Sequence, residues 1–510
     1  MNLQNYLIDT NVFIGLEDDK QVNQEVASFL ALANKHNIGV FVHEAAKDDI
    51  ARDSDAARRA VSLSKLDKFQ TLSKVRDLGE AGLAERYGDL TKPNDVVDAT
   101  LLHALDTGAV DFLITEDRGL HSRARRHASH LSRRVLFIAD AAALLISTYE
   151  PVAVPFRYVE EVSAHQIPAD DDIFDSLKEG YPGFENWWKK CVRDHRQCWA
   201  VYDNGLAGLI VRKDETQQES DATLPGQKIL KLCTFKVRPE KRGVKLGELL
   251  LKQALWFAQS NRYDVVYLTT QPEQQSLIDL IEYYGFEHTT TLDADELVFE
   301  KPLSPDKVQM RPNEDTYTVV RRHYPKFYVG PEIGGYIIPI RELYHDILFP
   351  ELKDDPQGSL FSILGMEPGP KSPGNTIRKV YLCRAQSNIK QPGSILFFYK
   401  GRSNLPPSQS ITTIGILEDM LLAESLTDLM RLAGGRSVYS EADLRAWGAS
   451  PEHPVKVINF LLAGYITPPV GIQALKADQV FGNHPPQSIC KLTMDKLRAV
   501  LSRSQLGFDT

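Results

Sequence analysis

One stretch near the middle of the chain, VRPEKRGVKLGELLLKQALWF over residues 237–257, restricts the fold more than any other. An apolar run that ends at Val237 leads into a basic, glycine-bearing turn, and Leu246, Leu250 and Ala254 then recur at helical spacing. A strand that enters a helix through such a turn directs free backbone N–H groups and the helix dipole at one point. The stretch therefore predicts an anion-binding turn, and a surface strand-turn-helix with a basic turn is the alternative.

The turn resembles the pyrophosphate loop of the GNAT acetyltransferases. In that family the loop reads Arg or Gln, two residues, Gly, one residue, and then Gly or Ala. Arg242 and Gly247 fit these positions, whereas Lys245 stands where the first glycine usually stands. The resemblance implies that acetyl-CoA binds here, in contact with Val237, Arg242, Gly243, Val244, Lys245, Leu246 and Gly247.

The order of predicted elements supports the same resemblance over residues 155–303. Asn204-Gly205 predicts a hairpin turn, because both residues accept the positive φ that a two-residue turn requires. The predicted elements are a hairpin over 199–211, a loop over 213–227, strands over 229–237 and 264–269, a helix from about 273 to 284, and a final Gly285-Phe286. The resemblance implies a GNAT α/β fold with a mixed sheet.

The place of the family's general acid differs in this chain. In many members a tyrosine four residues before the Gly-Phe protonates the leaving thiolate, and here that place is Ile281. Tyr283 and Tyr284 lie close in sequence, although both also fit the role of packing aromatics. The resemblance therefore favours acetyl-CoA binding over efficient transfer, and the acceptor amine, on a protein or on an aminoacyl-tRNA, stays open.

Acidic residues follow the predicted strands of the N-terminal part of the chain. Apolar residues 6–8 lead directly to Asp9, and residues 110–115 lead to Glu116 and Asp117. Predicted strands alternate with predicted helices, which indicates a parallel sheet with its ligand site at the carboxyl ends of the strands. Asp9 and Asp117 are therefore expected at the same edge of the sheet; solvated surface carboxylates are the alternative.

Further acids lie on the predicted helices between those strands. Glu44 and Asp49 follow the apolar run 38–42, and Asp95 and Asp98 share one face of a helix that begins near residue 95. Clustered carboxylates repel each other unless a cation neutralises them, and sites made only of oxygen ligands suit Mg²⁺ or Mn²⁺.

The order LIDTN, an acidic helix, NDVVDATLLHAL and LITEDRGL resembles the PIN nuclease domain over residues 1–148. The resemblance implies a parallel α/β/α sandwich and hydrolysis of a phosphodiester with Mg²⁺ or Mn²⁺. The implied catalytic acids are Asp9, Asp49, Asp95, Asp98 and Asp117, with Glu44 as the alternative to Asp49. Asp9, Asp117 and an acid from Asp95 or Asp98 would bind the metal, with Asn11 and Thr115 orienting them.

A basic run follows Asp117 directly. RGLHSRARRHASHLSRR over residues 118–134 contains six arginines and three histidines but no acid, in a chain whose formal net charge is −9. A solvated face is the ordinary explanation of such a run. Beside a metal site it instead predicts contact with the phosphates of RNA or DNA. The residues expected to make that contact are Arg118, Arg123, Arg125 and Arg126.

A third part of the chain, residues 326–510, follows a linker predicted at 304–325. Short strands are predicted over 336–340, 376–385, 394–400 and 411–417. GSILFFYKG followed by ITTIGILE resembles the PUA-like group that includes ASCH and EVE domains, which implies a small α+β barrel that reads RNA or modified bases. Tyr399, Lys400 and Arg402 place an aromatic beside cations at a strand end, which suits base stacking. A barrel that only packs against its neighbours is the alternative.

Length and composition limit the remaining classes. A chain of 510 residues predicts three units, and no apolar run approaches the roughly 18 residues that a membrane span needs. The N-terminus lacks a signal pattern, so a cytoplasmic protein is expected. The five cysteines are scattered without CxxC pairs, which favours neither a disulfide framework nor a zinc site.

These observations predict a multidomain α/β protein that acts on RNA. The expected activity is metal-dependent, PIN-type endoribonuclease cleavage by the N-terminal part, joined to an acetyl-CoA-binding GNAT part and a PUA-like part that selects the substrate. One alternative is a primary acetyltransferase whose other parts hold nucleic acid, and another is a regulator that senses acetyl-CoA without catalysis. The oligomeric state stays open.

Overall fold

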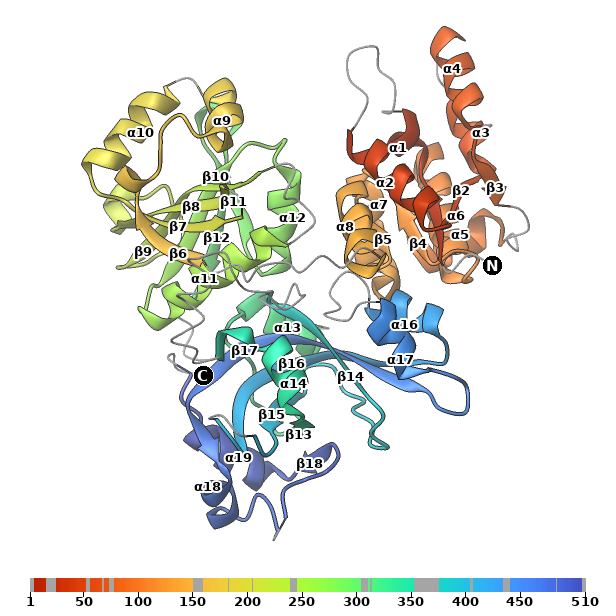
Figure 1. Cartoon of the computed structure of the whole chain (residues 1–510). Helices are drawn as coiled ribbons and strands as arrows, with labels where there is room; N and C mark the ends of the chain where they lie inside the picture. The colour runs from red at the N-terminus through yellow and green to blue at the C-terminus, as the bar shows by residue number, and fades with distance from the viewer. Residues whose placement is uncertain are drawn as a thin grey trace. The chain divides into compact units, whose positions relative to one another are not determined.

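The computed structural model describes residues 4–14, 24–51, 56–66, 68–72, 78–149, 159–181, 183–203, 205–238, 245–303, 311, 314–352, 376–403, 407–433, 441–482 and 484–506. The chain divides into two compact units (Figure 1). The first contains residues 1–152 and 423–455, and the second contains residues 153–422 and 456–510. Within the described ranges, no helix is both long and apolar enough to cross a membrane.

The first unit is built on a five-stranded sheet in the order β3-β2-β1-β4-β5, in which every pair is parallel. Its strands are β1 (Asn5–Ile8), β2 (Gly39–His43), β3 (Gln70–Leu72), β4 (Phe112–Ile114) and β5 (Val135–Leu136). Its helices are α1 (Thr10–Ile14), α2 (Gln24–Lys35), α3 (Ala45–Ala51), α4 (Ala56–Leu66), α5 (Gly79–Tyr87), α6 (Pro93–Asp106), α7 (Arg118–His127), η2 (Ser129–Leu131) and α8 (Ile138–Tyr149). The predicted parallel sheet is confirmed.

Both faces of this sheet are covered, and the alternation along β1 shows it. Tyr6 and Ile8 belong to one hydrophobic cluster, with residues of α2 and α8. Leu7 belongs to a second cluster, with residues of α5, α6 and α7. Successive side chains of a strand point to opposite faces, so an all-apolar strand requires helices on both sides.

A helical segment from far along the chain also belongs to the first unit. Helices α16 (Leu426–Ala433) and α17 (Glu441–Trp447) lie in sequence between strands β16 (Ser410–Ala423) and β17 (Val455–Gly471) of the C-terminal sheet. The Tyr149 hydroxyl lies 3.9 Å from Sδ of Met430, which joins α16 to the end of α8. The sequence did not predict this excursion, because neither helix differs in composition from others in the C-terminal part.

The second unit contains a seven-stranded sheet in the order β11-β12-β10-β9-β8-β7-β6. Its strands are β6 (Val159–Ser163), β7 (Gln197–Tyr202), β8 (Leu206–Glu215), β9 (Ile229–Val237), β10 (Val265–Thr270), β11 (Glu287–Thr291) and β12 (Leu297–Pro302). Its helical segments are η3 (Ala164–Gln166), η4 (Asp172–Phe174), α9 (Asp175–Gly180), α10 (Phe184–Arg193), η5 (Gln217–Glu219), α11 (Leu246–Ser260), α12 (Gln275–Tyr283) and η7 (Asp293–Asp295). Only β9 and β10 pair in parallel among these described strands, so the sheet is mixed, as predicted.

The same unit contains a six-stranded sheet in the order β14-β17-β16-β15-β13-β18. Its remaining strands are β13 (Gly335–Ile340), β14 (Arg378–Cys383), β15 (Ile395–Lys400) and β18 (Cys490–Leu492). Its helical segments are α13 (Thr316–His323), α14 (Glu342–Leu348), η8 (Pro350–Leu352), α18 (Ile472–Ala477) and α19 (Met494–Arg503). Within the described residues β14 and β18 end this order without pairing to each other, so the predicted closed barrel is not found there.

The two sheets of the second unit share one hydrophobic core. A single cluster of buried side chains extends from α11 and α12 to β13, β15 and β16. Trp256 of α11 donates a hydrogen bond of 2.7 Å to the hydroxyl of Tyr324, and Val319 and Val320 of α13 are buried. Residues 316–323 of the predicted linker form α13, which packs into this core.

Candidate functional site

The parallel strands at the centre of the seven-stranded sheet separate along their length. β9 pairs with β8 from Ile229 to Val237, with one register shift. It pairs with β10 only over its first three residues, Ile229 to Lys231. From Cys233 to Val237 the β9 side chains are half-buried, whereas Ile229 and Leu230 are fully buried. The side of β9 that faces β10 therefore loses its strand partner beyond Lys231, which leaves its backbone groups available to a ligand.

The helix that follows β9 begins at an unusual backbone conformation. Lys245 lies in the left-handed region with φ 62° and ψ 25°, and α11 starts at the next residue. Its carbonyl accepts the first helical hydrogen bond, from Leu249 N at 3.1 Å. A lysine pays a steric penalty in this region that a glycine does not, so the backbone of this turn is the one expected of a glycine.

Gly247 lies in the first turn of α11 and faces α12. A Cβ atom added to it would lie 3.2 Å from Leu280 Cδ2, which is tighter than an ordinary contact. Leu246 and Leu250 are buried and fix the helix against the sheet. Arg242, Gly243 and Val244 lie outside the described residues, so the first half of the predicted loop has no structural account.

The two tyrosines near the expected general-acid position have other contacts. The Tyr283 hydroxyl lies 3.1 Å from that of Tyr317, and the guanidinium groups of Arg321 and Arg378 lie 4.4 and 4.5 Å from its ring centre. Tyr284 is 1% exposed, and burial raises the pKa of its phenol far above the ordinary value. Both side chains pack between the two sheets of the unit, as the alternative explanation expected.

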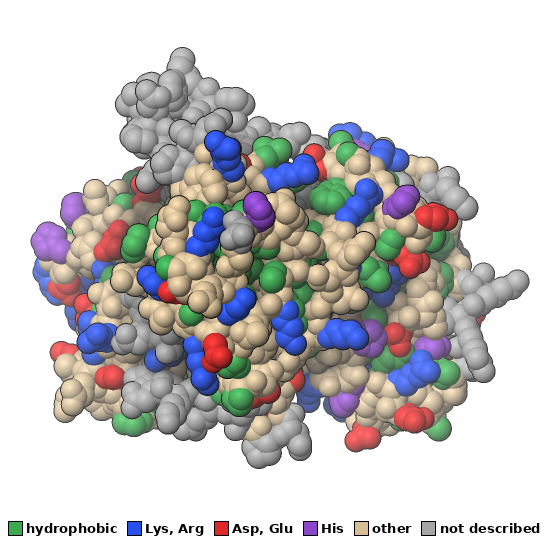
Figure 2. All heavy atoms as spheres, turned by 90° about the horizontal axis from the view of Figure 1, so that it is seen from below, with side chains coloured by type: hydrophobic (Ala, Val, Ile, Leu, Met, Phe, Trp, Pro, Cys, Tyr) green, Lys and Arg blue, Asp and Glu red, His purple; other side chains and the backbone are tan. Residues whose placement is uncertain are grey.

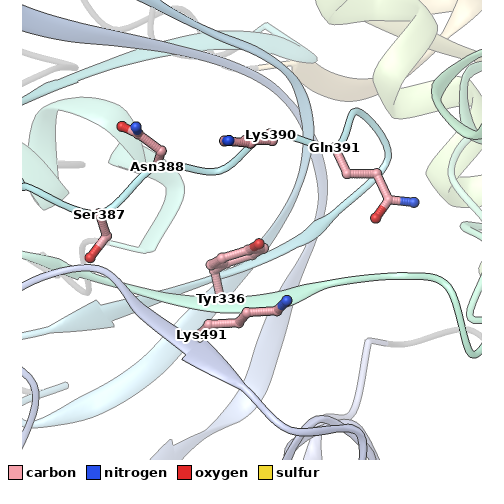
Figure 3. Close-up of a pocket in the computed structure, with 6 residues that line it drawn as sticks. All are labelled: Tyr336, Ser387, Asn388, Lys390, Gln391 and Lys491. Atoms are coloured by element: carbon pink, nitrogen blue, oxygen red, sulfur yellow. The ribbon is translucent and has the colours of Figure 1, made fainter.

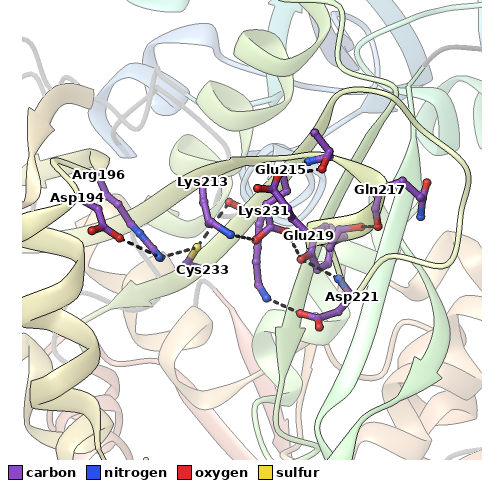
Figure 4. Close-up of polar contacts among 12 residues, drawn as sticks. Asp194, Arg196, Lys213, Glu215, Gln217, Glu219, Asp221, Lys231 and Cys233 are labelled. Atoms are coloured by element: carbon purple, nitrogen blue, oxygen red, sulfur yellow. Dashed lines mark hydrogen bonds and ion pairs between the residues drawn. The ribbon is translucent and has the colours of Figure 1, made fainter.

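A polar network that the sequence did not indicate crosses the sheet beside β9 (Figure 4). Tyr267 of β10 donates to the buried carboxylate of Glu215, and Lys213 pairs with the same group. The backbone N–H of Asp221 donates to the Tyr267 hydroxyl at 3.2 Å, and Lys231 pairs with Asp221 at 2.6 Å. These contacts hold the loop after β8 against the sheet. The opposite charges of Lys213 and Glu215, two residues apart, were the only signal of this network in the sequence.

In the first unit, Asp9 lies in a dense set of hydrogen bonds at the end of β1. It is 6% exposed and accepts from Thr10 N at 2.7 Å, Thr115 Oγ1 at 2.7 Å and Asn11 Nδ2 at 2.9 Å. Thr115 Oγ1 also accepts from Asp117 N at 2.9 Å. Asn11 and Thr115 therefore orient Asp9, and Thr115 links it to the second strand-end acid.

The ionisation of Asp98 is shifted by its surroundings. Burial and the carboxylates of Asp117 and Asp9, with a smaller contribution from Asp95, together raise the pKa of Asp98 to about 7 against the opposing charge of Arg123. Burial also raises the pKa of Asp9, partly offset by its hydrogen bonds. Asp9, Asp98 and Asp117 therefore form one carboxylate cluster.

This cluster does not form a complete ligand set on its own. Among the described side chains, no three His, Cys, Asp or Glu residues are arranged to hold a metal ion. The side chain of Asp49 lies outside the described residues, so its predicted role has no structural account. Glu44 lies between β2 and α3 and is exposed.

Asp95 does not belong to the carboxylate cluster, although it shares a helix with Asp98. Its carboxylate accepts from Thr91 N and Lys92 N, both at 2.8 Å, and pairs with Arg123 at 2.7 Å. The bond from the Lys92 backbone lowers the pKa of Asp95 to about 2. Asp95 closes the N-terminus of α6, so Asp98 is the acid that faces Asp9 and Asp117.

The predicted basic run divides into two kinds of arginine. Arg118, Arg125 and Arg126 of α7 are exposed, and Arg126 bonds to Ser122 on its own helix. Arg123 instead donates to the carbonyls of Tyr87, Gly88 and Asp89 at 3.0, 3.2 and 3.1 Å, besides its pair with Asp95. Arg123 thus holds the segment between α5 and α6 in place, which differs from its predicted role as a phosphate contact.

Replacing Arg123 with glutamine is expected to destabilise the first unit by about 2 kcal/mol, because three carbonyl acceptors and a carboxylate lose a charged donor. Arg126→Gln is the matched control, since this arginine is exposed and, in the part of the chain that the structure describes, bonds only to Ser122, at 2.6 Å. Hydrogen exchange of peptides from residues 79–106, followed against urea concentration, measures the difference. Equal protection in the two variants would contradict the structural role of Arg123.

In the C-terminal sheet, two of the three residues expected to contact nucleic acid are buried. Tyr399 is 2% exposed, and its ring packs against Phe481. Lys400 is 3% exposed and pairs with Asp346 at 3.3 Å and Glu342 at 3.7 Å. A base could stack on Tyr399 only if this packing opened, so Arg402 alone of the three lies at the surface.

Part of the second unit is similar in sequence to a known family. Residues 162–286 match the sequence model of the Acetyltransferase (GNAT) family, so this part of the chain is a GNAT domain. These residues include β9, the described part of the turn and α11. No curated protein matches the chain.

Several solved structures resemble separate parts of the chain. The ASCH protein from Zymomonas mobilis is 14% identical, covers 34% of this chain and 96% of its own, and has a TM-score of 0.23. The IAA acetyltransferase from Bacillus cereus is 15% identical, covers 29% of this chain and 100% of its own, and has a TM-score of 0.24. An acetyltransferase of the GNAT family from Desulfovibrio desulfuricans is 15% identical, covers 29% of this chain and 100% of its own, and has a TM-score of 0.23.

Proposed function

We propose that the second unit transfers an acetyl group from acetyl-CoA to an amine. The observation that carries this proposal is the GNAT match over residues 162–286, which spans the point where β9 leaves β10. The unpaired edge of β9 offers backbone groups to the pantetheine amides, and the N-terminus of α11 offers N–H groups to the pyrophosphate. In the reaction the amine nitrogen forms an amide bond with the acetyl carbon, and the thioester C–S bond breaks. The amine loses one proton, and the released CoA thiolate gains one to become a thiol.

The chain's own residues decide how fast this reaction proceeds. Ile281 is fully buried and apolar, and the hydroxyls of Tyr283 and Tyr284 lie in the interface between the sheets. Protonation of the departing thiolate by one of these tyrosines would require that interface to open. Water or the acceptor itself must then supply the proton, which favours a slow transferase or a sensor of acetyl-CoA over a fast enzyme.

The test is a direct measurement of binding and turnover by the full chain. Calorimetry with acetyl-CoA measures binding, and mass spectrometry detects an acetylated product with a lysine peptide, a polyamine or an aminoacyl-tRNA as acceptor. Binding with product supports a transferase, and binding without product from any acceptor supports a sensor. An absence of binding heat would overturn both.

A second candidate function rests on the carboxylate cluster. We propose that Asp9, Asp98 and Asp117 contribute to a Mg²⁺ or Mn²⁺ site for hydrolysis of a phosphodiester, which groups outside the described residues would complete. The donor atoms fit a cation in their chemistry, since carboxylate oxygens are hard ligands and the negative charges of Asp117 and Asp9 raise the pKa of Asp98. A bound metal ion would supply a hydroxide and stabilise the charge of the displacement. Thr115 and Asn11 fix the orientation of Asp9.

Arg118 lies next to this cluster because α7 begins directly after Asp117, and Arg125 and Arg126 follow in the last turn of the same helix. Arg118, Arg125 and Arg126 could therefore bind the phosphates of a nucleic acid whose scissile bond lies at the acids. RNA is the proposed substrate. Figure 2 shows basic side chains spread among polar and hydrophobic ones on the face that is seen from below.

The pH dependence of stability tests the cluster without an activity assay. The folded pKa of Asp98, about 7, exceeds the ordinary value of 3.8, so the folded state keeps a proton that the unfolded state releases between those values. Its contribution to stability is full below pH 4 and is lost as the pH rises to 7. Asp98→Asn should remove this loss and stabilise the metal-free first unit at pH 8, by roughly 2 kcal/mol after allowance for solvent screening.

Urea-dependent hydrogen exchange of residues 93–127 at pH 5 and pH 8 measures the effect. Asp95→Asn is the control with the opposite sign, since the pKa of Asp95 is lowered and its ionised form stabilises the fold. Mn²⁺ added at pH 8 should stabilise the natural protein more than Asp98→Asn. A stability of Asp98→Asn that falls with pH as in the natural protein would contradict the assigned pKa.

A further inference from the structure

A polar pocket lies at the amino ends of β13 and β15, whereas Lys400 lies at the carboxyl end of β15. Its volume is about 350 Å³, which falls at the small end of the range for ligand sites. It is lined by Tyr336, Ser387, Asn388, Lys390, Gln391 and Lys491. These residues come from β13, from β18 and from the loop between β14 and β15, and none of them is acidic.

The loop that forms one wall of the pocket is held by a buried cation. Lys456 of β17 is 8% exposed, and its ammonium group donates to the carbonyls of Gln386 at 3.0 Å and Ser387 at 2.8 Å, and to that of Ala385. Ser387 Oγ donates to the carbonyl of Ile489 at 2.9 Å, which ties the loop to the segment before β18. The pocket wall is therefore fixed, and a positive charge lies behind it.

Three of the polar side chains that line the pocket lack partners among the described residues. Within the described residues, neither the ammonium groups of Lys390 and Lys491 nor the hydroxyl of Tyr336 makes a hydrogen bond or an ion pair. Other lysines of the sheets in this unit have partners: Lys231 pairs with Asp221 at 2.6 Å, and Lys379 donates to the carbonyl of Leu348 at 2.7 Å. Lys390 and Lys491 instead line the same hollow without a partner among the described residues.

Figure 3 shows how these side chains are arranged. Tyr336 and Lys491 lie side by side along one wall, and Lys390 lies across from them with Asn388 and Gln391 on either side. The Tyr336 ring rests on the backbone of Gly334, where an added Cβ would lie 2.9 Å from its Cε2 atom. The ring is thereby held in place with one side available to the pocket.

We propose that this pocket binds the phosphate monoester of a small organic molecule. A phosphate dianion accepts several hydrogen bonds at once, and ammonium, phenol and amide groups supply donors without any carboxylate to repel it. The Tyr336 ring and the amides of Asn388 and Gln391 would contact the organic part. The site is independent of the acetyl-CoA site and of the carboxylate cluster, because it shares no residue with either.

The test uses the full chain and calorimetry at low ionic strength with uridine 5′-monophosphate, uridine and inorganic phosphate. Uridine 5′-monophosphate should bind, inorganic phosphate should bind more weakly, and uridine should not bind. Lys390→Gln with Lys491→Gln should weaken the nucleotide at least about 10-fold, because both charges that face the phosphate are lost. Lys476→Gln with Lys496→Gln removes the same charge from helices α18 and α19 of the same unit, outside the pocket, and should leave binding unchanged.

Equal nucleotide binding by the two double variants would overturn the proposal, as would equal binding of uridine and its monophosphate or no binding of any probe. Acetyl-CoA binding should be the same in both variants, which separates this result from the proposed transferase. A 5′-phosphorylated oligonucleotide that binds more tightly than the mononucleotide, and loses this affinity in Lys390→Gln with Lys491→Gln, would support the site and identify a strand end as the source of the phosphate. Equal binding supports a free metabolite.

Discussion

Replacing Gly247 with glutamate is expected to weaken acetyl-CoA binding at least about 100-fold, or about 2.8 kcal/mol. Two effects combine in this substitution. The new side chain begins 3.2 Å from Leu280 at its Cβ, so it must displace α12 or turn toward the pyrophosphate. Its carboxylate then lies at the N-terminus of α11, where it competes with the phosphates for the same N–H groups and repels them. Calorimetry of the full chain with acetyl-CoA measures the loss.

Two variants separate these effects from a general disturbance of the fold. Gly247→Ala introduces the close contact with Leu280 but no charge, so it should weaken binding only modestly. Lys245→Ala keeps the left-handed backbone at φ 62° and removes one positive charge, so it too should only weaken binding. Full binding by Gly247→Glu would show that the turn is structural and would remove the main support for an acetyl-CoA site there.

Asp9→Asn is expected to abolish Mn²⁺-dependent cleavage of RNA. Asp9 is the acid with the most fixed orientation, and its amide replacement removes one negative charge from a cluster whose other members are Asp98 and Asp117. A metal ion bound by carboxylates loses affinity when one becomes neutral, because hard cations prefer charged oxygen ligands. The measurement is cleavage of a labelled RNA with Mn²⁺, compared with the same reaction in a chelator.

The control for this variant must show that the first unit still folds. Asn at position 9 keeps the acceptor for the bonds from Thr10 and loses the one for the Thr115 hydroxyl, which can rotate, so far-ultraviolet circular dichroism should be unchanged. Asp95→Asn is the matched substitution, since it removes an acid from α6 that lies outside the cluster, and it should keep its cleavage. Retained cleavage by Asp9→Asn, or equal loss in both variants, would exclude the proposed metal site.

Local signals in the sequence were sufficient for the elements that hold both candidate sites. Strand β1 before Asp9, strand β4 before Asp117 and the turn into α11 all lie where apolar runs met polar or glycine-bearing turns. These predictions succeeded because each depends on residues adjacent in sequence, whose periodicity fixes the secondary structure and whose order fixes which ends of parallel strands coincide. The match to the GNAT family covers the turn that the sequence singled out.

Contacts between distant residues decided what the sequence left open. Asp95 and Asp98 share a helix face, but the helix N-terminus and Arg123 bind Asp95, so only Asp98 joins the acids. Tyr399 and Lys400 lie at the end of a strand, where exposed residues are expected. Phe481 nevertheless packs on Tyr399, and Asp346 and Glu342 pair with Lys400. The separation of β9 from β10 and the pocket beside Tyr336 likewise arise from packing of segments far apart in sequence. Sequence patterns determine which residues of an element face a core. Burial and charge pairing depend on which residues, distant in sequence, pack against them.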